Sequence, residues 1–314
     1  MNMSEDEEIE ANNNVTDLCC ASCGIAEIDE VKLKGCDDCD LVRYCSDNCQ
    51  RDHKSEHEEA CKKRAAELRD ELLFKQPESS HLGDCPICSL PLPLDQEKSS
   101  TYQCCSKTIC YGCALAHQVR QFKMGLQCSC PFCREPSLIT EEEWDRHRMK
   151  RIEANDPVAM CMEGWKQYIK GEYRRAFEYL SKAAELGDAG AHCRLAYLYH
   201  DGRGVDKDEE KEIYHMEKAA IAGYPAARHN LAFNEWENGN VERAVKHLII
   251  SATQGFDLSI KALMEKFREG HVSKEVLATA LRAHKAAVDA TKSPQREKAE
   301  RAKSMSSSIR RQMS

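Results

Sequence analysis

The sequence predicts two small metal-stabilised modules followed by an all-α array of helical repeats, with disordered termini. Two observations indicate this order along the chain. Of the 19 cysteines, eight lie between Cys19 and Cys61 and nine lie between Cys85 and Cys133. Beyond Cys133 the cysteine density falls, and small residues recur at intervals of 32 to 36 residues, a period typical of stacked helical hairpins.

The overall composition is that of a protein exposed to water rather than to lipid. The chain is 41% hydrophobic and 31% charged, and we find no apolar run of the length of a membrane span. Residues 1–10 are acidic where a signal peptide would be basic and then apolar. We therefore expect a cytoplasmic or nuclear protein without membrane contact, and its net charge of −8 argues against nonspecific binding of nucleic acid.

Both ends of the chain lack apolar residues to bury. Residues 1–18 contain six acidic side chains and no Lys or Arg, whereas residues 291–314 are rich in Lys and Arg. Segments of this composition bury too little apolar surface to offset the conformational entropy that the chain loses on folding. We expect an acidic disordered tail over 1–18 and a basic disordered tail over 291–314.

The first cluster, residues 19–61, is spaced to hold two metal ions. Cysteine pairs in a reducing compartment favour metal binding over disulfides, and two such pairs complete a tetrahedral site at about 2.0–2.3 Å. His57 and Cys61 are four residues apart and share one face of a helix. The eight candidate ligands are Cys20, Cys23, Cys36, Cys39, Cys45, Cys49, His57 and Cys61.

This pattern resembles the MYND zinc finger, and Tyr44 and Gln50 also match that family. The resemblance implies an interleaved topology, in which the first and third pairs hold one Zn²⁺ and the second and fourth pairs hold the other, leaving Cys19 spare. MYND fingers bind proline-containing peptides, commonly with a Trp shortly after the Gln. Lys54 stands at that position here, so a finger that only folds and positions its neighbours is the competing interpretation.

The second cluster, residues 81–136, resembles a RING finger, whose two zinc ions are held crosswise. The resemblance implies one site formed by Cys85, Cys88, Cys110 and Cys113, and a second formed by Cys130, Cys133 and two ligands from the middle of the module. The usual His position is occupied by Lys107, a poor zinc ligand because its amine must first lose a proton. Cys104 and Cys105 are our candidates for the two remaining ligands, and Cys128 is the rival for one of these places.

A RING finger does no covalent chemistry but orients a ubiquitin-conjugating enzyme that carries ubiquitin. Three contact positions of the family match here, namely Ile87, Pro131 and Arg134. An Arg at the last position suits this role because its fork of donors can bond two partners. Residues 114–129 lack the Trp often found on the contacting helix, so an interaction finger without ligase activity is the alternative.

The remaining segments are predicted to be helical. Residues 62–80 are predicted to be a helical linker, with a helix that ends before Pro77. In residues 137–290 the joins at Asn155, Gly187, Gly223 and Gly255 are 32, 36 and 32 residues apart, which predicts four helix pairs over about 157–289. Tyr199 to Val205 and the Lys-Ala-Ala element that follows resemble a Sel1-like repeat, related to the tetratricopeptide repeat, and such solenoids bind proteins along a concave face.

The order of these modules resembles known arrangements of RING-type fingers and Sel1-like repeats. It implies a RING-type ubiquitin ligase with four zinc ions per chain. A ubiquitin-conjugating enzyme would bind the second module, and the repeats and the MYND-like finger would hold a substrate or adaptor. Two alternatives stay open: a non-enzymatic scaffold that assembles protein partners, and a MYND-type corepressor finger that binds proline-containing peptides.

Overall fold

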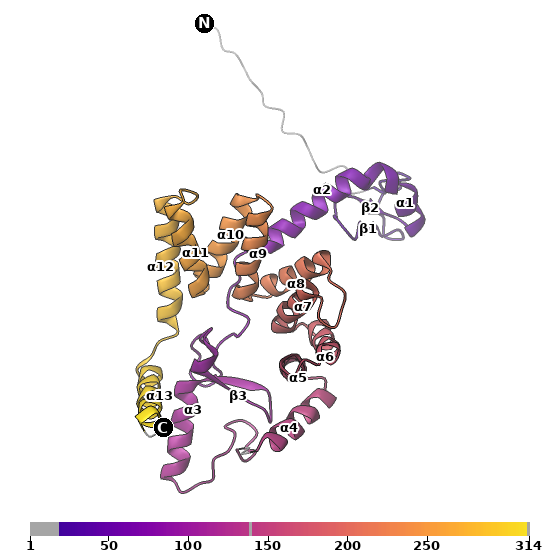
Figure 1. The fold of residues 1–314 in the computed structure, drawn as a ribbon. Coiled ribbons are helices and arrows are strands. Elements are labelled where there is room, and N and C mark those ends of the chain that lie inside the picture. The colour runs from indigo at the N-terminus through magenta and orange to yellow at the C-terminus, as the bar shows by residue number, and fades with distance from the viewer. Residues whose placement is uncertain (1–18, 138–139, 313–314) are drawn as a thin grey trace. The chain divides into compact units, whose positions relative to one another are not determined.

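The computed structural model describes residues 19–137 and 140–312. It divides into two compact units, Met1–Leu73 and Phe74–Ser314, and Figure 1 shows the elements of each. The predicted acidic tail over 1–18 lies outside the described residues. None of the described helices is both long enough and apolar enough to cross a bilayer.

The first unit contains a minimal hairpin and two helices. Strands β1 (Lys34–Gly35) and β2 (Arg43–Tyr44) pair antiparallel. They are followed by α1 (Asp47–Asp52) and the long helix α2 (Lys54–Leu73). Its small core consists of Cys20, Cys36, Cys39 and Tyr44. Because three of these four side chains are cysteines, the unit has too little apolar surface to fold by burial alone, as is usual for metal-stabilised modules.

The second unit begins with the other cysteine-rich module. A 3₁₀ turn, η2 (Gln96–Lys98), leads into the antiparallel hairpin of β3 (Ser99–Tyr102) and β4 (Lys107–Cys110). Helix α3 (Tyr111–Lys123) follows directly, with Cys110 as its N-cap. Leu92, Ile109 and Ala114 add apolar side chains to a core that is otherwise made of cysteines.

A helical array follows the second module. Helix α4 (Glu141–Glu153) begins with a capping box between Thr140 and Glu143. The next helices are α5 (Pro157–Ile169), α6 (Tyr173–Glu185), α7 (Ala189–Asp201), α8 (Glu209–Ile221), α9 (Pro225–Glu237), α10 (Val241–Thr253), α11 (Asp257–Arg268) and α12 (Lys274–Ala290). These eight make four pairs over 157–290, in agreement with the predicted repeats.

The turns between the helix pairs explain the spacing in the sequence. Gly187, Gly223 and Gly255 have φ of 88°, 81° and 88°, and Asn155 has φ of 57° at the earlier join. Glycine is favoured in this left-handed conformation because it has no Cβ, and asparagine tolerates it. The recurring small residues of the sequence therefore mark the point where each pair of helices ends.

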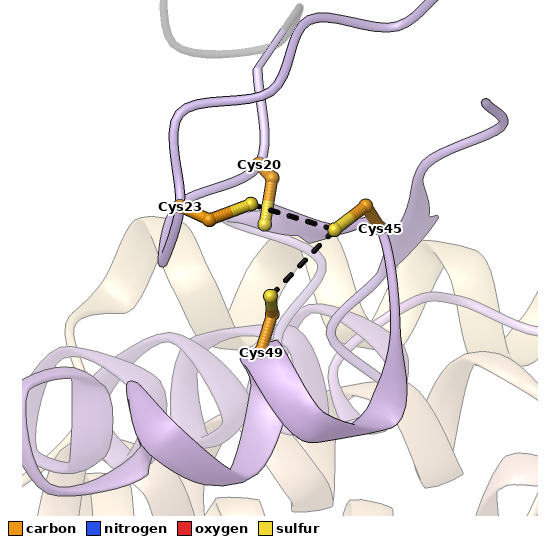
Figure 2. Close-up of side chains that lie close together, drawn as sticks. All are labelled: Cys20, Cys23, Cys45 and Cys49. Atoms are coloured by element: carbon orange, nitrogen blue, oxygen red, sulfur yellow. Dashed lines mark hydrogen bonds between the residues drawn. The ribbon is translucent and has the colours of Figure 1, made fainter.

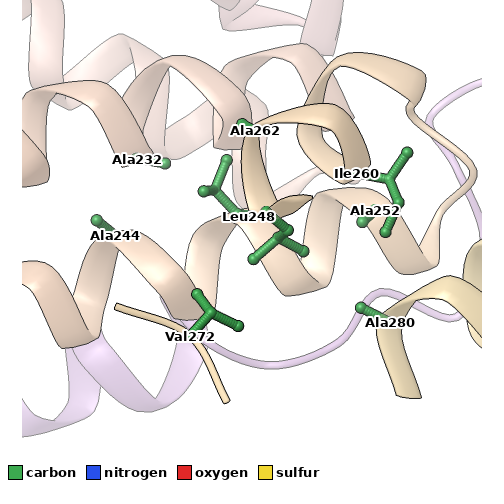
Figure 3. Close-up of a cluster of buried hydrophobic side chains, with 9 residues drawn as sticks. Ala232, Ala244, Leu248, Ala252, Ile260, Ala262, Val272 and Ala280 are labelled. Carbon is green, nitrogen blue, oxygen red and sulfur yellow. The ribbon is translucent and has the colours of Figure 1, made fainter. Parts of the chain in front are cut away.

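Small side chains let the helices approach closely. Figure 3 shows Ala232, Ala244, Leu248 and Ile260 within the buried cluster of the last two pairs. In the first pair, a Cβ added to Gly164 would lie 2.7 Å from Cγ of the fully buried Leu180. Close packing of this kind fixes the relative position of the paired helices.

The linker differs from its predicted form. Helix α2 begins at Lys54, inside the first module, and ends at Leu73, before Pro77 as expected, but residues 74–80 of the predicted helical linker are not helical. The next residues contact the repeats: Arg228 Nη2 donates to the carbonyl oxygen of Lys75 at 3.2 Å, and the His81 N–H donates to that of Gly223 at 3.0 Å. Helical periodicity does not detect such backbone contacts, which explains the difference.

The C-terminal segment also differs from its predicted form. Residues 294–312 form helix α13, Pro294–Gln312, where the basic composition predicted a disordered tail. Helix α13 packs against α3 of the second cysteine module. Over residues 294–305 the contacts are mainly hydrogen bonds and ion pairs, with Ala299 as the buried apolar side chain, so this stretch lacks the apolar stripe that would have indicated a packed helix.

Candidate metal centres

Four Cys-x-x-Cys segments share one backbone conformation. The residue after the second cysteine has a left-handed conformation, and its N–H donates to the carbonyl oxygen of the first cysteine. The donors are Gly24, Asp40, Ser89 and Arg134, at 2.8, 3.0, 2.8 and 3.1 Å from the oxygens of Cys20, Cys36, Cys85 and Cys130. This closed turn holds both cysteine side chains on the same side, as a shared metal site requires.

The first group of candidate ligands is Cys20, Cys23, Cys45 and Cys49 (Figure 2). The Sγ of Cys45 lies 3.5 Å from that of Cys23 and 3.6 Å from that of Cys49. Cys49 is placed by the start of α1, where the Ser46 hydroxyl accepts from its N–H at 3.3 Å. A turn, a strand end and a helix N-terminus thus converge on one point.

The second group is Cys36, Cys39, His57 and Cys61. Sγ of Cys36 lies 3.7 Å from that of Cys61, and Sγ of Cys39 lies 3.1 Å from Nε2 of His57. His57 and Cys61 both belong to α2, as their spacing of four predicts. Burial, followed by the neighbouring His53, lowers the pKa of His57 and thereby favours the neutral imidazole that binds metals. The His53 ring is bonded to the Tyr44 hydroxyl and lies outside the group.

The third group is Cys85, Cys88, Cys110 and Cys113, all in the second module. Sγ of Cys88 lies 3.8 Å from that of Cys110. The pair Cys110 to Cys113 differs from the closed turns because it forms the start of α3, where the Cys113 N–H points at Sγ of Cys110 at 3.4 Å. The closed turn Cys85–Cys88, the first knuckle of this module, therefore shares its site with the N-terminus of α3. Backbone N–H groups at a helix N-terminus favour thiolate.

The fourth group is Cys104, Cys105, Cys130 and Cys133. Sγ of Cys105 lies 3.7 Å from that of Cys130, and Sγ of Cys133 lies 3.3 Å from that of Cys104. The structure thus brings both adjacent cysteines to the last knuckle. The rival, Cys128, is exposed and lies outside the group.

Lys107 stands where the usual RING finger has its histidine, and the structure gives it another contact. Its amine lies 5.3 Å from the centre of the Phe132 ring, within the range of a cation–π interaction. Position 107 is therefore not part of the fourth group, which is completed by Cys104 instead.

The geometry of all four groups fits zinc. Within each group the ligand atoms lie within 4.8 Å of one another. Zn–S bonds of about 2.3 Å in a tetrahedron give S···S distances of about 3.8 Å. One S···S distance from each group is close to this value: 3.5 Å for Cys23–Cys45, 3.7 Å for Cys36–Cys61, 3.8 Å for Cys88–Cys110 and 3.7 Å for Cys105–Cys130. In both modules the first and third pairs share one site, and the second and fourth pairs share the other.

The first cysteine of each closed turn has a lowered pKa. Burial raises the pKa of Cys20, but backbone N–H groups, foremost that of Cys23, outweigh burial and bring the pKa to about 6. Burial likewise raises the pKa of Cys85, and N–H donors led by that of Cys110 bring it to about 7. The same balance lowers the pKa of Cys36 and Cys130. Each site therefore contains one thiol that the backbone prepares to bind as thiolate.

The two cysteines of the helical repeats have the opposite environment. Burial raises the pKa of Cys161 to about 12 and that of Cys193 to about 11. Both side chains are buried on helix faces, which is typical of structural cysteines. Neither belongs to a metal-binding group.

Comparison with known families identifies parts of this architecture. Residues 20–61 match the MYND finger, and residues 159–188 and 189–224 match the Sel1 repeat. The chain carries a MYND finger and Sel1 repeats. A MYND finger binds zinc, so the first two groups lie in a zinc-binding module. Neither match includes the second cysteine module, residues 81–136.

Two solved structures are similar to parts of the chain. A Sel1 repeat protein from Oxalobacter formigenes is 22% identical with a TM-score of 0.42, and the match covers 57% of this chain and 71% of that chain. The second is c5321, a protective antigen present in uropathogenic Escherichia coli strains that displays an SLR fold. It is 22% identical with a TM-score of 0.38, and the match covers 52% of this chain and 36% of that chain. No curated protein sequence matched the chain.

The MYND finger has a hollow beside its second group. The hollow has a volume of about 610 Å³, and its lining includes Tyr44, Gln50 and Lys54. Lys54 therefore lies in the surface where the family commonly presents a Trp. A hollow is present, but its flat aromatic anchor is replaced by a flexible cation, which changes the ligands that it can hold.

The three predicted contact positions lie on two knuckles of the second module. Ile87 is 47% exposed inside the first knuckle, and Arg134 is exposed directly after the last ligand. Pro131 is half-buried. Sequence reasoning missed Arg296 of α13, which donates to Sγ of Cys88 at 3.2 Å. The only signal that could have indicated it is the alternation of charge over 296–303, which also suits a solvated tail.

Proposed function

We propose that this chain assembles protein partners, with the Sel1 repeats as the main partner-binding surface and the zinc modules as further contacts. An aromatic hollow on the repeats supports this proposal. It has a volume of about 210 Å³, and its lining includes Trp165 of α5, Tyr197 of α7 and Tyr224 before α9. Trp165 and Tyr197 are each 41% exposed. Exposed aromatic side chains beside a hollow are typical anchors of protein interfaces.

The hollow has a charged and a polar component as well. The Arg194 guanidinium lies 5.0 Å from the centre of the Trp165 ring, and the Asn230 amide donates to the Tyr197 hydroxyl at 2.7 Å. These contacts restrict both aromatic side chains, so a partner would find them ordered in advance. The first helices of three successive pairs, α5, α7 and α9, contribute to this surface. Such a surface suits an extended segment of a partner protein that lies across the repeats.

Trp165→Ala tests this surface, with Tyr214→Ala as the matched control. Tyr214 is also exposed, at 52%, but it lies on α8, outside the hollow. Proteins that copurify with each full-length variant are quantified by mass spectrometry. We expect a set of partners to be lost with Trp165→Ala and kept with Tyr214→Ala. Equal retention by both variants would remove the hollow as the binding surface.

A second candidate function is ubiquitin ligation by the second module, as a RING-type finger. Two observations favour it. The crosswise arrangement of the third and fourth groups resembles that of a RING finger, and Ile87 and Arg134 are exposed at positions that correspond to conjugating-enzyme contacts in that family. Helix α3 also exposes Phe122, at 83%. An exposed apolar side chain on this helix offers surface that the missing Trp would otherwise provide.

Autoubiquitination with a panel of conjugating enzymes distinguishes the two candidates. Ligase activity should fall in Ile87→Ala and Arg134→Ala. Ile28→Ala is the control, because Ile28 is similarly exposed, at 53%, but lies in the MYND finger. If the wild-type chain builds no ubiquitin chains with any enzyme of the panel, or if both variants keep full activity, the ligase proposal is wrong and partner assembly stands alone.

The corepressor alternative depends on the MYND hollow. Lys54→Trp restores the aromatic residue that the family commonly uses, so it should increase binding to an array of proline-containing peptides. Wild-type binding to such peptides would support a corepressor-type finger. If neither form binds any peptide, the finger serves folding and positioning.

A further inference from the structure

Helix α13 lies on the second cysteine module, far from it in sequence. Ala299 is 2% exposed, and Lys303 donates to the Glu97 carbonyl oxygen at 2.9 Å. Glu300 pairs with Lys98 at 3.3 Å. One side of α13 therefore contacts the segment between the first knuckle and the β3–β4 hairpin, and Figure 1 shows the helix beside α3.

Among the cations of residues 294–305, Arg296 is the most deeply buried, with 5% of its surface exposed. Its Nη1 donates to the carbonyl oxygens of Pro91 and Thr291, both at 2.7 Å. Its Nη2 donates to the Leu90 carbonyl oxygen at 3.1 Å and to Sγ of Cys88 at 3.2 Å. A single guanidinium thus connects a candidate metal ligand, the backbone that follows it and the end of the repeat array.

Gln295 gives the third group a second contact with α13. Its Nε2 donates to the Gly112 carbonyl oxygen at 3.1 Å and lies 3.8 Å from Sγ of Cys113. Two of the four sulfurs of this group therefore receive N–H groups from α13.

Gly112 is what allows this approach. A Cβ at this position would lie 3.0 Å from Cα and 3.1 Å from the backbone nitrogen of Arg296. These atoms belong to the α13 backbone, which cannot move aside as a flexible side chain could. Only glycine lets α13 come this close to the third group.

The charge balance explains why a cation belongs here. Four thiolates around one Zn²⁺ leave a net charge of −2, which is costly in a partly buried site. A guanidinium bonded to one of the sulfurs offsets part of this charge, and charge-assisted hydrogen bonds are about twice as strong as neutral ones. Groups that bond to metal ligands in this way fix their orientation and increase metal affinity.

We propose that α13 is an integral part of the third metal centre and that Arg296 is the positioning residue through which the C-terminus holds that centre together. The ion would be zinc, bound by Cys85, Cys88, Cys110 and Cys113. The proposal concerns metal retention, and it stands whether or not the module acts as a ligase. It also ties the centre to the end of α12 through Thr291.

Metal release from the full-length, zinc-loaded protein tests the proposal. Arg296→Ala is compared with wild type and with Arg301→Ala, which removes an exposed cation from the same helix. Zinc transfer to a colorimetric chelator is followed over time. We expect one zinc equivalent of four to leave roughly 10–100-fold faster in Arg296→Ala, and no change in Arg301→Ala. Release unchanged in Arg296→Ala, or equally accelerated in Arg301→Ala, would overturn the proposal.

A spectroscopic measurement separates positioning from general destabilisation. Arg296→Lys keeps the charge but not the fork of donors, and ¹¹³Cd-substituted protein reports each centre by its own resonance. We expect the resonance of one all-cysteine centre to shift in Arg296→Lys while the other three keep their positions. Loss or movement of all four resonances together would show that Arg296 serves folding in general, and the proposal would be wrong. If Arg296→Ala does not fold, the cadmium resonances of Arg296→Lys decide the question alone.

Discussion

The repeats should become less stable as the pH falls, because of one buried histidine. His247 of α10 is fully buried, and among the described residues neither ring nitrogen has a hydrogen-bond partner. The Phe74 ring lies 4.7 Å from it. Burial, followed by the charges of Arg228 and Arg243, lowers the pKa of His247 from 6.5 to about 3. The folded protein therefore keeps this side chain neutral where the unfolded chain binds a proton.

The sign and magnitude follow from this difference. Well above pH 6.5 His247 is neutral in both states and makes no pH-dependent contribution. Between pH 6.5 and about 3 the unfolded state gains a proton that the folded state does not, so the free energy of unfolding falls by about 1.4 kcal/mol per pH unit. From pH 7 to pH 5 the loss from His247 alone amounts to about 2 kcal/mol.

His247→Leu isolates this contribution. Urea unfolding of the helical signal at pH 7 and pH 5 gives the free-energy change for each form. Acid effects on the cysteine modules are common to both forms and cancel in the comparison. We expect the variant to lose about 2 kcal/mol less than wild type between the two pH values. The same substitution at the exposed His200 controls for loss of an imidazole as such. Equal pH dependence in wild type and His247→Leu would refute the reasoning.

Three further outcomes test the packing and the metal sites. Gly164→Ala should lower the free energy of unfolding by about 1–2 kcal/mol, although alanine favours helices, because its Cβ would overlap Leu180; a stabilised variant in thermal unfolding would contradict this. Cys104→Ser should reduce the zinc content measured by elemental analysis, whereas Cys128→Ser should not; the reverse result would restore Cys128 as ligand. Zinc chelation should unfold residues 19–136 and leave most of the circular dichroism of the repeats; loss of the whole helical signal would show that the repeats depend on the metal.

Local spacing was sufficient to predict the repeat architecture and the cysteine pairs, whereas the grouping of those pairs came from the resemblance to MYND and RING fingers. A closed turn needs only Cys-x-x-Cys and a residue that tolerates the left-handed conformation, so the knuckles can be recognised from a few neighbouring residues. The helix pairs are similarly local, and their joins at Gly187, Gly223 and Gly255 fall where the small residues recur. Spacing favoured Cys104 and left Cys128 as its rival, because Cys128 lies on the far side of α3 and only the three-dimensional arrangement shows which sulfur lies near Cys130 and Cys133.

Contacts between distant segments could not be predicted in the same way. Arg296 lies 208 residues from Cys88, and nothing in a charged, alanine-containing stretch indicates that one guanidinium will be buried against a sulfur. The segment after Leu73 contacts the repeats through carbonyl oxygens, which every residue carries. Both cases involve polar contacts without an apolar pattern, so hydrophobic periodicity cannot detect them.

The central claim is that two cysteine modules hold two zinc ions each. Native mass spectrometry of the full-length chain, purified under reducing conditions with zinc, measures the number of bound ions directly. The four groups of ligand atoms predict a mass increase of four zinc ions per chain. A mass increase of only two ions would show that one module is not a double zinc site, and it would contradict the account.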